Sequence, residues 1–75
     1  MQANSELFDQ DPTTYNNIGV AQTNLGISQK DKPLLESAIQ HFQKAIAIAK
    51  LNPGKSYPTA EANRKWSIEE LSKLI

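Results

Sequence analysis

The segment from Pro33 to Leu51, PLLESAIQHFQKAIAIAKL, constrains the fold most, because its apolar residues repeat at helical spacing without interruption. With about 3.6 residues per turn, one helix face collects its apolar side chains. These are Leu35, Ala38, Ile39, Phe42, Ala45, Ile46 and Ala49. Alanines on this face leave room for a neighbouring backbone, and the larger side chains fill the space beside them. The segment is therefore predicted to be a surface helix that needs partners on both sides.

Length and charge narrow the classes of function. Seventy-five residues make one small domain, and a chain this short buries only about 60% of its unfolded surface. Eight basic and eight acidic residues give zero formal charge, so no field gathers nucleic acid or an acidic membrane. No apolar run approaches the roughly 18 residues of a spanning helix. We expect a soluble, cytoplasmic protein that neither binds nucleic acid nor inserts into a membrane.

The start of the chain predicts a lead-in and a first helix. We expect residues 1–11 to be flexible, with Leu7 and Phe8 docking on the helix, and residues 12–75 to form a single domain. Asp11 caps a helix that starts at Pro12, runs to about Leu25 and ends with Gly26 as a left-handed cap. Its expected inward face comprises Tyr15, Ile18, Gly19, Ala21 and Leu25, with Gln22 beside them.

Gly19 is the exception within that helix. A glycine in a helix interior costs roughly 0.5–1 kcal/mol relative to alanine. Its presence predicts that another helix packs closely against the backbone there. The alternative is a tolerated weak position with no packing role.

Two more helices follow. The second covers about residues 33–51, with Asp31 or Lys32 as its cap, and ends before Asn52-Pro53-Gly54. The third covers about residues 58–75, begins at Pro58 with Thr59 as an alternative cap, and packs against the second.

The apolar arc of the third helix appears late, at Ile68, Leu71, Leu74 and Ile75. Because Glu61 and Arg64 lie on the same side earlier in the helix, we expect its first half to project from the core. Ser67-Ile68-Glu69-Glu70 matches a capping box, so a break near Trp66 is an alternative. We favour one continuous helix, because no helix breaker lies between Arg64 and Glu69.

The first two helices resemble a tetratricopeptide repeat (TPR), a helix-turn-helix unit with small and aromatic residues at set spacings. The matching positions are Tyr15, Ile18-Gly19, Ala38, Phe42 and Ala45. The chain departs from the pattern in three ways. Gln22 replaces the usual tyrosine, the terminal proline falls late at Pro53, and the spacing from Gly19 to Ala38 exceeds the standard 34-residue repeat by about seven residues.

Two further resemblances cover parts of this outline. IAIAKLNPGKSYPTAEA, with Gly54, Tyr57 and Pro58, is similar to the longer repeats of kinesin light chains. That resemblance makes the third helix the first half of a second repeat or a terminal covering helix. Microtubule-interacting and transport (MIT) domains, three-helix bundles with an Ala-aromatic-Ala second helix, are the alternative resemblance. Either way, the expected fold is all-α, an antiparallel helix-turn-helix plus a third C-terminal helix.

The TPR resemblance implies a binding surface. In that family the first helices line a concave surface that accepts a peptide or helix. The corresponding positions here are Thr13, Asn16, Asn17, Val20, Thr23 and Asn24. Their amides are suited to pair with the backbone of a partner, although solvated amides are the plain alternative. No basic residue accompanies them, which argues against a clamp for a terminal carboxylate.

No residue set in the sequence predicts catalysis. There is no serine-histidine-acid arrangement and no glycine-rich phosphate loop, and the adjacent Glu69 and Glu70 point in different directions on a helix. His41 is the only histidine and cysteine is absent, which does not build a zinc site. Trp66 is either an interface anchor or a packing residue. We expect no enzyme activity, no cofactor and no metal.

The expected function is therefore protein–protein interaction, as a TPR-like adaptor, scaffold or assembly module with a protein or peptide partner. Stacked repeats usually need about three units for stability, so we also expect a longer array or self-association into an oligomer. Two alternatives remain. One is an MIT-like peptide-binding domain, and the other is a non-catalytic regulatory fragment of a larger enzyme.

Overall fold

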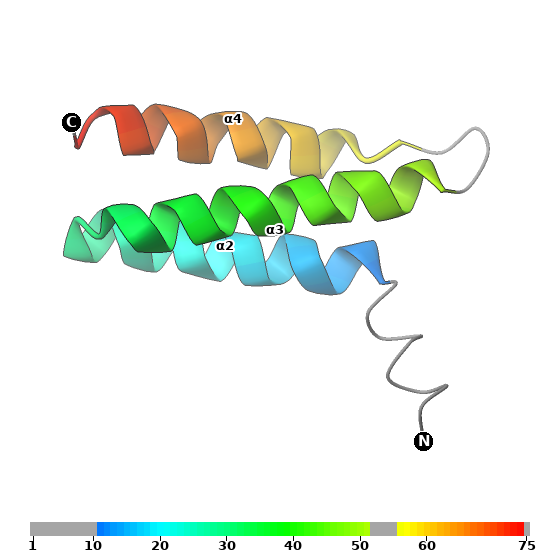
Figure 1. Ribbon diagram of the computed structural model, residues 1–75, viewed down its shortest axis with the longest axis horizontal. Helices are drawn as coiled ribbons and strands as arrows, with labels where there is room; N and C mark the ends of the chain where they lie inside the picture. The colour runs from blue at the N-terminus through cyan, green and yellow to red at the C-terminus, as the bar shows by residue number, and fades with distance from the viewer. Residues whose placement is uncertain (1–10, 52–55, 75) are drawn as a thin grey trace, which may run out of the picture.

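The computed structural model describes residues 11–51 and 56–74, which form three helices and no strand (Figure 1). Helix α2 spans Pro12–Gln29, α3 spans Lys32–Lys50 and α4 spans Pro58–Ser72. Helix α3 runs antiparallel to α2, and α4 returns along α3 in the same direction as α2. The predicted all-α class with three helices is confirmed. The predictions for residues 1–10, 52–55 and 75 lie outside the described residues.

The helix starts follow the local sequence signals. The Asp11 carboxylate accepts a hydrogen bond from the Thr13 backbone N–H at 2.9 Å, and the Asp31 carboxylate accepts one from the Leu34 N–H at 3.1 Å. Each therefore satisfies a backbone donor that has no partner within its helix. Helix α4 begins at Pro58 without a side-chain cap, so Thr59 does not serve as one.

Helix α2 is about one turn longer than predicted. The left-handed residue that ends it is Lys30, with φ 54° and ψ 46°, and the prediction of Gly26 as the cap is wrong. The backbone N–H groups of Lys30 and Asp31 donate to the carbonyls of Ile27 and Gly26 at 3.3 and 2.9 Å. Two residues, Lys30 and Asp31, thus connect α2 to α3, which holds the two helices tightly antiparallel.

The core follows the predicted face of α3. Leu35, Ala38, Phe42 and Ala45 have no exposed surface, Ile46 and Ala49 are also buried, and Ile39 is half-buried. This confirms the apolar stripe read from the sequence. Within the described residues, none of the three helices combines the length and apolar character needed to cross a membrane.

Helix α4 is continuous through Trp66, as favoured. It packs along α3, but the expectation that its first half projects from the core is wrong. Ala60 is fully buried in a cluster with Ala45 and Ile46 of α3, which Tyr15 and Tyr57 flank. The small side chain of Ala60 lets α4 approach α3 closely. Ile68, expected to anchor the later arc, is instead 46% exposed.

Candidate functional site

Large side chains of α3 pack directly against two glycines of α2. A Cβ atom added to Gly19 would lie 2.6 Å from Phe42 Cε1, and one added to Gly26 would lie 2.8 Å from Leu35 Cγ. Both distances are too short for any side chain, so the glycines are required for the close approach. The packing role predicted for Gly19 is confirmed. Gly26 repeats it seven residues later, because Leu35 also precedes Phe42 by seven.

Two polar residues of α2 join it to α4. The hydroxyls of Thr23 and Ser67, both without exposed surface, lie 2.7 Å apart, and Asn63 Nδ2 donates to Asn16 Oδ1 at 3.1 Å. Asn16 and Thr23 are themselves seven residues apart. We call this row of four residues the polar seam. Packing of the third helix against the second is predicted from the sequence, and this direct contact with the first helix is an additional finding.

The two hydroxyls of the polar seam also contact backbone carbonyl groups. The Thr23 hydroxyl lies 2.8 Å from the Gly19 carbonyl, and the Ser67 hydroxyl lies 3.1 Å from the Asn63 carbonyl. Each hydroxyl has one proton, so one hydroxyl donates to a carbonyl while the other donates across the Thr23–Ser67 contact. Both buried hydroxyls are satisfied in this way, which avoids the cost of an unpaired polar group.

The buried face of α2 is therefore small and polar. It consists of Asn16, Gly19, Thr23 and Gly26. The expected inward positions Ile18, Ala21 and Leu25 are exposed instead, with 38% of Ile18 and 48% of Leu25 accessible. That expectation is wrong because the close contacts to Phe42 and Leu35 need glycine, which an apolar pattern does not reveal. Tyr15 is half-buried beside the core, as its inward assignment implies.

The residues predicted to bind a partner fall into two groups. Asn16 and Thr23 are buried in the polar seam, so their side chains are occupied by α4. Thr13, Asn17 and Asn24 are exposed, and Val20 is half-buried. Val20 lies four residues after Asn16 and three before Thr23, which places it beside α4. We call Thr13, Asn17, Val20 and Asn24 the α2–α4 face.

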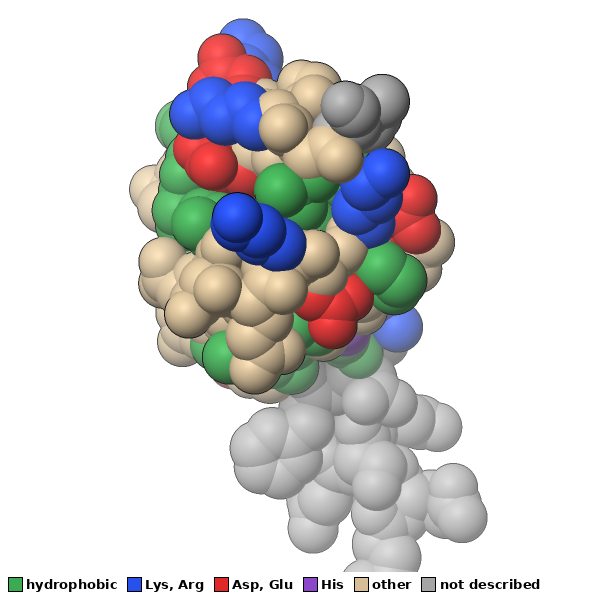
Figure 2. Space-filling view, turned by 90° about the vertical axis from the view of Figure 1, so that its left-hand side faces the viewer, with side chains coloured by type: hydrophobic (Ala, Val, Ile, Leu, Met, Phe, Trp, Pro, Cys, Tyr) green, Lys and Arg blue, Asp and Glu red, His purple; other side chains and the backbone are tan. Residues whose placement is uncertain are grey.

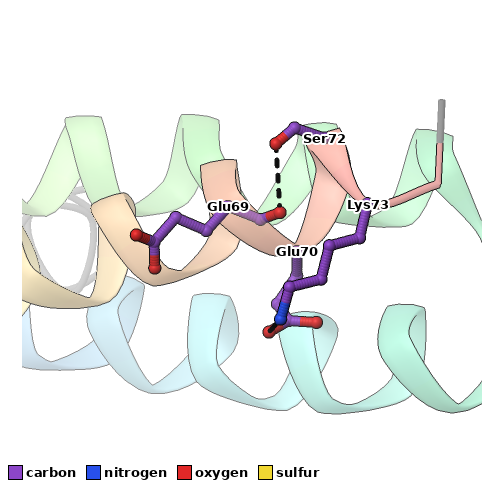
Figure 3. Close-up of polar contacts among 4 residues, drawn as sticks. All are labelled: Glu69, Glu70, Ser72 and Lys73. Carbon is purple, nitrogen blue, oxygen red and sulfur yellow. Dashed lines mark hydrogen bonds and ion pairs between the residues drawn. The ribbon is translucent and has the colours of Figure 1, made fainter.

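Helix α4 contributes further groups to this side. Trp66 and Glu70 follow Asn63 by three and seven residues, so both lie on the side of α4 that faces α2, and both are half-buried. Near the C-terminal end of α4, Lys73 Nζ lies 3.0 Å from Glu70 Oε2, and the Ser72 hydroxyl donates to the Glu69 carbonyl at 3.1 Å (Figure 3). The edge of the α2–α4 face thus combines an aromatic ring with an ion pair.

His41 belongs to a polar cluster between α2 and α3. Its Nδ1 lies 2.8 Å from Gln22 Oε1 and 2.9 Å from the Ser37 carbonyl, both acceptors, so Nδ1 carries the proton. The imidazole stacks on Tyr15 with ring centroids 6.1 Å apart, and Lys44 Nζ lies 4.6 Å from the Tyr15 ring centre. These contacts give His41 a structural role in the helical pair. Gln22, the departure from the repeat pattern, supplies one of them.

Among residues 11–51 and 56–74, no group of three or more acidic or histidine side chains is arranged to hold a metal ion. Comparison with models of protein families, with curated proteins and with solved structures finds no match for this chain. The TPR and MIT resemblances consequently rest on the residues themselves.

Proposed function

We propose that this chain is a non-catalytic protein–protein interaction module of TPR type, an adaptor or assembly factor that presents its α2–α4 face to a peptide or helix. The main support is that α2 and α4 run in the same direction along α3 (Figure 1) and touch each other through the polar seam. In the resembled family, first helices of successive repeats line the binding surface in this way. The proposal places the chain in the cytoplasm, which suits a chain without cysteine.

The long spacing between Gly19 and Ala38 is compatible with the repeat geometry. The connector is only two residues, so the roughly seven extra residues lengthen the helices rather than the loop. Two antiparallel helices share them, about one turn each. The added turns contain the Gly26–Leu35 contact, a copy of the Gly19–Phe42 contact. The extension thus preserves the packing of the pair.

The chemistry of the α2–α4 face suits a peptide backbone. Asn17 and Asn24 each offer two N–H donors and a carbonyl acceptor, and both are exposed. Val20 supplies an apolar centre between them. Since Asn16 and Thr23 are engaged in holding α4, the proposed binding set is reduced to Thr13, Asn17, Val20 and Asn24, with Trp66 beside them.

The proposal is tested by partner capture. Wild-type protein and an Asn17→Ala/Val20→Asp variant serve as bait in native lysate, with quantitative mass spectrometry of the captured proteins. The matched control is Gln40→Ala/Gln43→Asp, which makes the same kind of change at the same spacing on exposed positions of α3. We expect the α2 variant to lose a specific partner that the control retains. Equal recovery by all three would contradict the proposal, provided circular dichroism shows equal helix content.

Binding of a candidate peptide is then measured directly. Trp66 is the only tryptophan, and it lies beside the α2–α4 face, so its fluorescence reports occupancy without a label. We expect a saturable change in Trp66 emission with wild type and with the α3 control. The α2 variant should need at least about tenfold more peptide, equivalent to about 1.4 kcal/mol.

One observation favours the MIT-like alternative. The polar seam brings α2 into contact with α4, so each helix touches both others, as in a closed three-helix bundle. A peptide-binding bundle of this kind offers other surfaces, including the side of α4 away from α2, where Ile68 is 46% exposed. Loss of the partner with Ile68→Asp, but not with the α2 variant, would favour this alternative.

A further inference from the structure

Helix α2 carries no charged residue. Its 18 residues, PTTYNNIGVAQTNLGISQ, contain no Asp, Glu, Lys, Arg or His, and charges resume only at Asp11 before it and Lys30 after it. A surface with about 25–35% charged residues is the design target for a soluble domain. In the end view of Figure 2, charged side chains lie over the upper part, the centre and the right-hand side of the molecule, whereas its lower left is mostly uncharged. Depletion of charge is typical of the centre of a protein interface.

The exposed side of α2 also carries an apolar stripe. Ile18, Ala21 and Leu25 are spaced at three and four residues, which places them on one face. Ala21 lies on the side of α2 opposite to the buried residues, and the stripe borders the α2–α4 face, because Asn17 and Asn24 lie four residues before and three residues after Ala21. No described residue covers it, as the 38% and 48% exposure of Ile18 and Leu25 shows.

We propose that this stripe is a homodimer interface, in which α2 of a second copy of the chain packs antiparallel with Ala21 at the two-fold axis. At such an axis Ala21 meets its own copy, so a charge at the centre of the interface would face a like charge. The uncharged helix avoids this. Ala21 permits close approach, and Ile18 of each copy meets Leu25 of the other.

The charged residues at the two ends of α2 favour an antiparallel over a parallel dimer. In that arrangement Asp11 of one copy comes near Lys30 of the other, at both ends of the interface. Both residues are exposed. A parallel pair would instead place like charges together at each end, and the helix dipoles would also repel. Charge complementarity therefore favours an antiparallel second copy over a parallel one.

The available area predicts weak association. A helix of this length is about 27 Å long and about 10 Å wide, so each copy offers on the order of 300 Å². Stable complexes bury about 1,200–2,000 Å² in total. We therefore expect a dimer that forms at roughly 100 µM protein and dissociates on dilution. Because Asn17 and Asn24 adjoin Ala21, the second copy borders the α2–α4 face. Measuring both dimerisation and partner capture for the Ala21 charge variants and for Asn17→Ala/Val20→Asp therefore distinguishes failure of this inference from failure of the proposed function.

The central test uses charges at Ala21. Wild-type protein, Ala21→Glu and Ala21→Lys are compared by sedimentation velocity from roughly 10 µM to 1 mM, a range that brackets the expected weak association. We expect wild type to dimerise, each variant alone to lose at least about tenfold in association, and their equimolar mixture to recover it. Ala47→Glu, at an exposed alanine of α3, is the matched control and should dimerise as wild type does. Both variants should stay folded, since Ala21 is exposed and Glu and Lys are good helix formers.

Cysteine crosslinking tests the direction. The chain has no cysteine, so Ala21→Cys should form a disulfide-linked dimer on mild oxidation, and Ala47→Cys should not. A mixture of Thr14→Cys and Ser28→Cys should give the mixed dimer in preference to either self-linked one. A wild-type protein that stays monomeric at 1 mM, or a dimer insensitive to both Ala21 charge variants, would overturn the proposal and assign the stripe to a partner of different sequence.

Discussion

Helix α2 meets its two neighbours through opposite kinds of chemistry. Against α3 it presents Gly19 and Gly26, which receive Phe42 and Leu35 in contacts that leave no room for another atom. Against α4 it presents Asn16 and Thr23, which form hydrogen bonds to Asn63 and Ser67. Both rows recur at seven residues, so one small-residue surface serves two interfaces.

These two kinds of contact contribute differently to the stability of the domain and to the position of α4 along α2. Large apolar side chains packed without voids supply most of the favourable free energy of folding. A hydrogen bond adds only about 0.5–1.5 kcal/mol net, but a buried polar group left without its partner costs more. We therefore expect the α2–α3 contacts to determine whether the domain folds, and the polar seam to determine where α4 lies along α2.

The strongest test of this division is Phe42→Ala. Removing the fully buried ring should destabilise the domain by about 3–5 kcal/mol, a large share of the 5–15 kcal/mol typical of a domain. Urea unfolding followed by circular dichroism measures the change. The control Ile68→Ala, at a side chain that is 46% exposed, should cost less than about 1 kcal/mol. Similar losses at the two positions would contradict a core centred on α3.

Gly19→Ala should come next in size. The added Cβ would lie 2.6 Å from the Phe42 ring, so overpacking of about 1–3 kcal/mol should exceed the gain of about 1 kcal/mol in helix propensity. In a Phe42→Leu background the clash is relieved, and the same substitution should become neutral or stabilising. Ser28→Ala, at an exposed position of α2, is the propensity control. Equal effects of Gly19→Ala in both backgrounds would mean that the ring does not require the glycine.

The polar seam should give smaller, local effects. Ser67→Ala leaves Thr23 bonded to the Gly19 carbonyl, so we expect a loss of about 1 kcal/mol. The double variant Thr23→Val/Ser67→Ala should lose less than the sum of the single variants, because both polar groups are then removed. Hydrogen exchange measured by NMR should rise in α4 more than in α2 and α3. A uniform rise across the three helices would assign the seam a general stabilising role instead.

The sequence predicts the features of this molecule that depend on neighbouring residues. Asp11 and Asp31 cap the helices that follow them, and the buried face of α3 is apolar and periodic. The face of α2 is different, because its burial depends on residues far along the chain. Phe42 requires the glycine at 19, and Ser67 pairs with Thr23 across 44 positions. The spacing of apolar residues along the sequence does not predict such contacts.

The same limit applies to the candidate binding residues. The TPR resemblance implies six binding positions on α2, but in the structure the side chains of Asn16 and Thr23 are bonded to α4. A usable signal was present in the seven-residue recurrence of two glycines, Gly19 and Gly26, together with that of Asn16 and Thr23. The glycine row follows the Asn16/Thr23 row by three positions. Such a pair of rows indicates a helix that two neighbouring helices approach closely.

The smallest effect should come from Lys73, whose ion pair with Glu70 lies on the same helix as Ser67. The lysine side chain is 69% exposed and the glutamate 21%, so water and salt screen the pair. We expect Lys73→Ala to change the free energy of unfolding by less than about 0.5 kcal/mol, and 1 M salt to remove the difference. The Ser67 contact is buried and joins two helices, whereas the Lys73 contact is exposed and joins residues three apart in the chain. A loss at Lys73 as large as that at Ser67 would contradict this ranking of the two contacts.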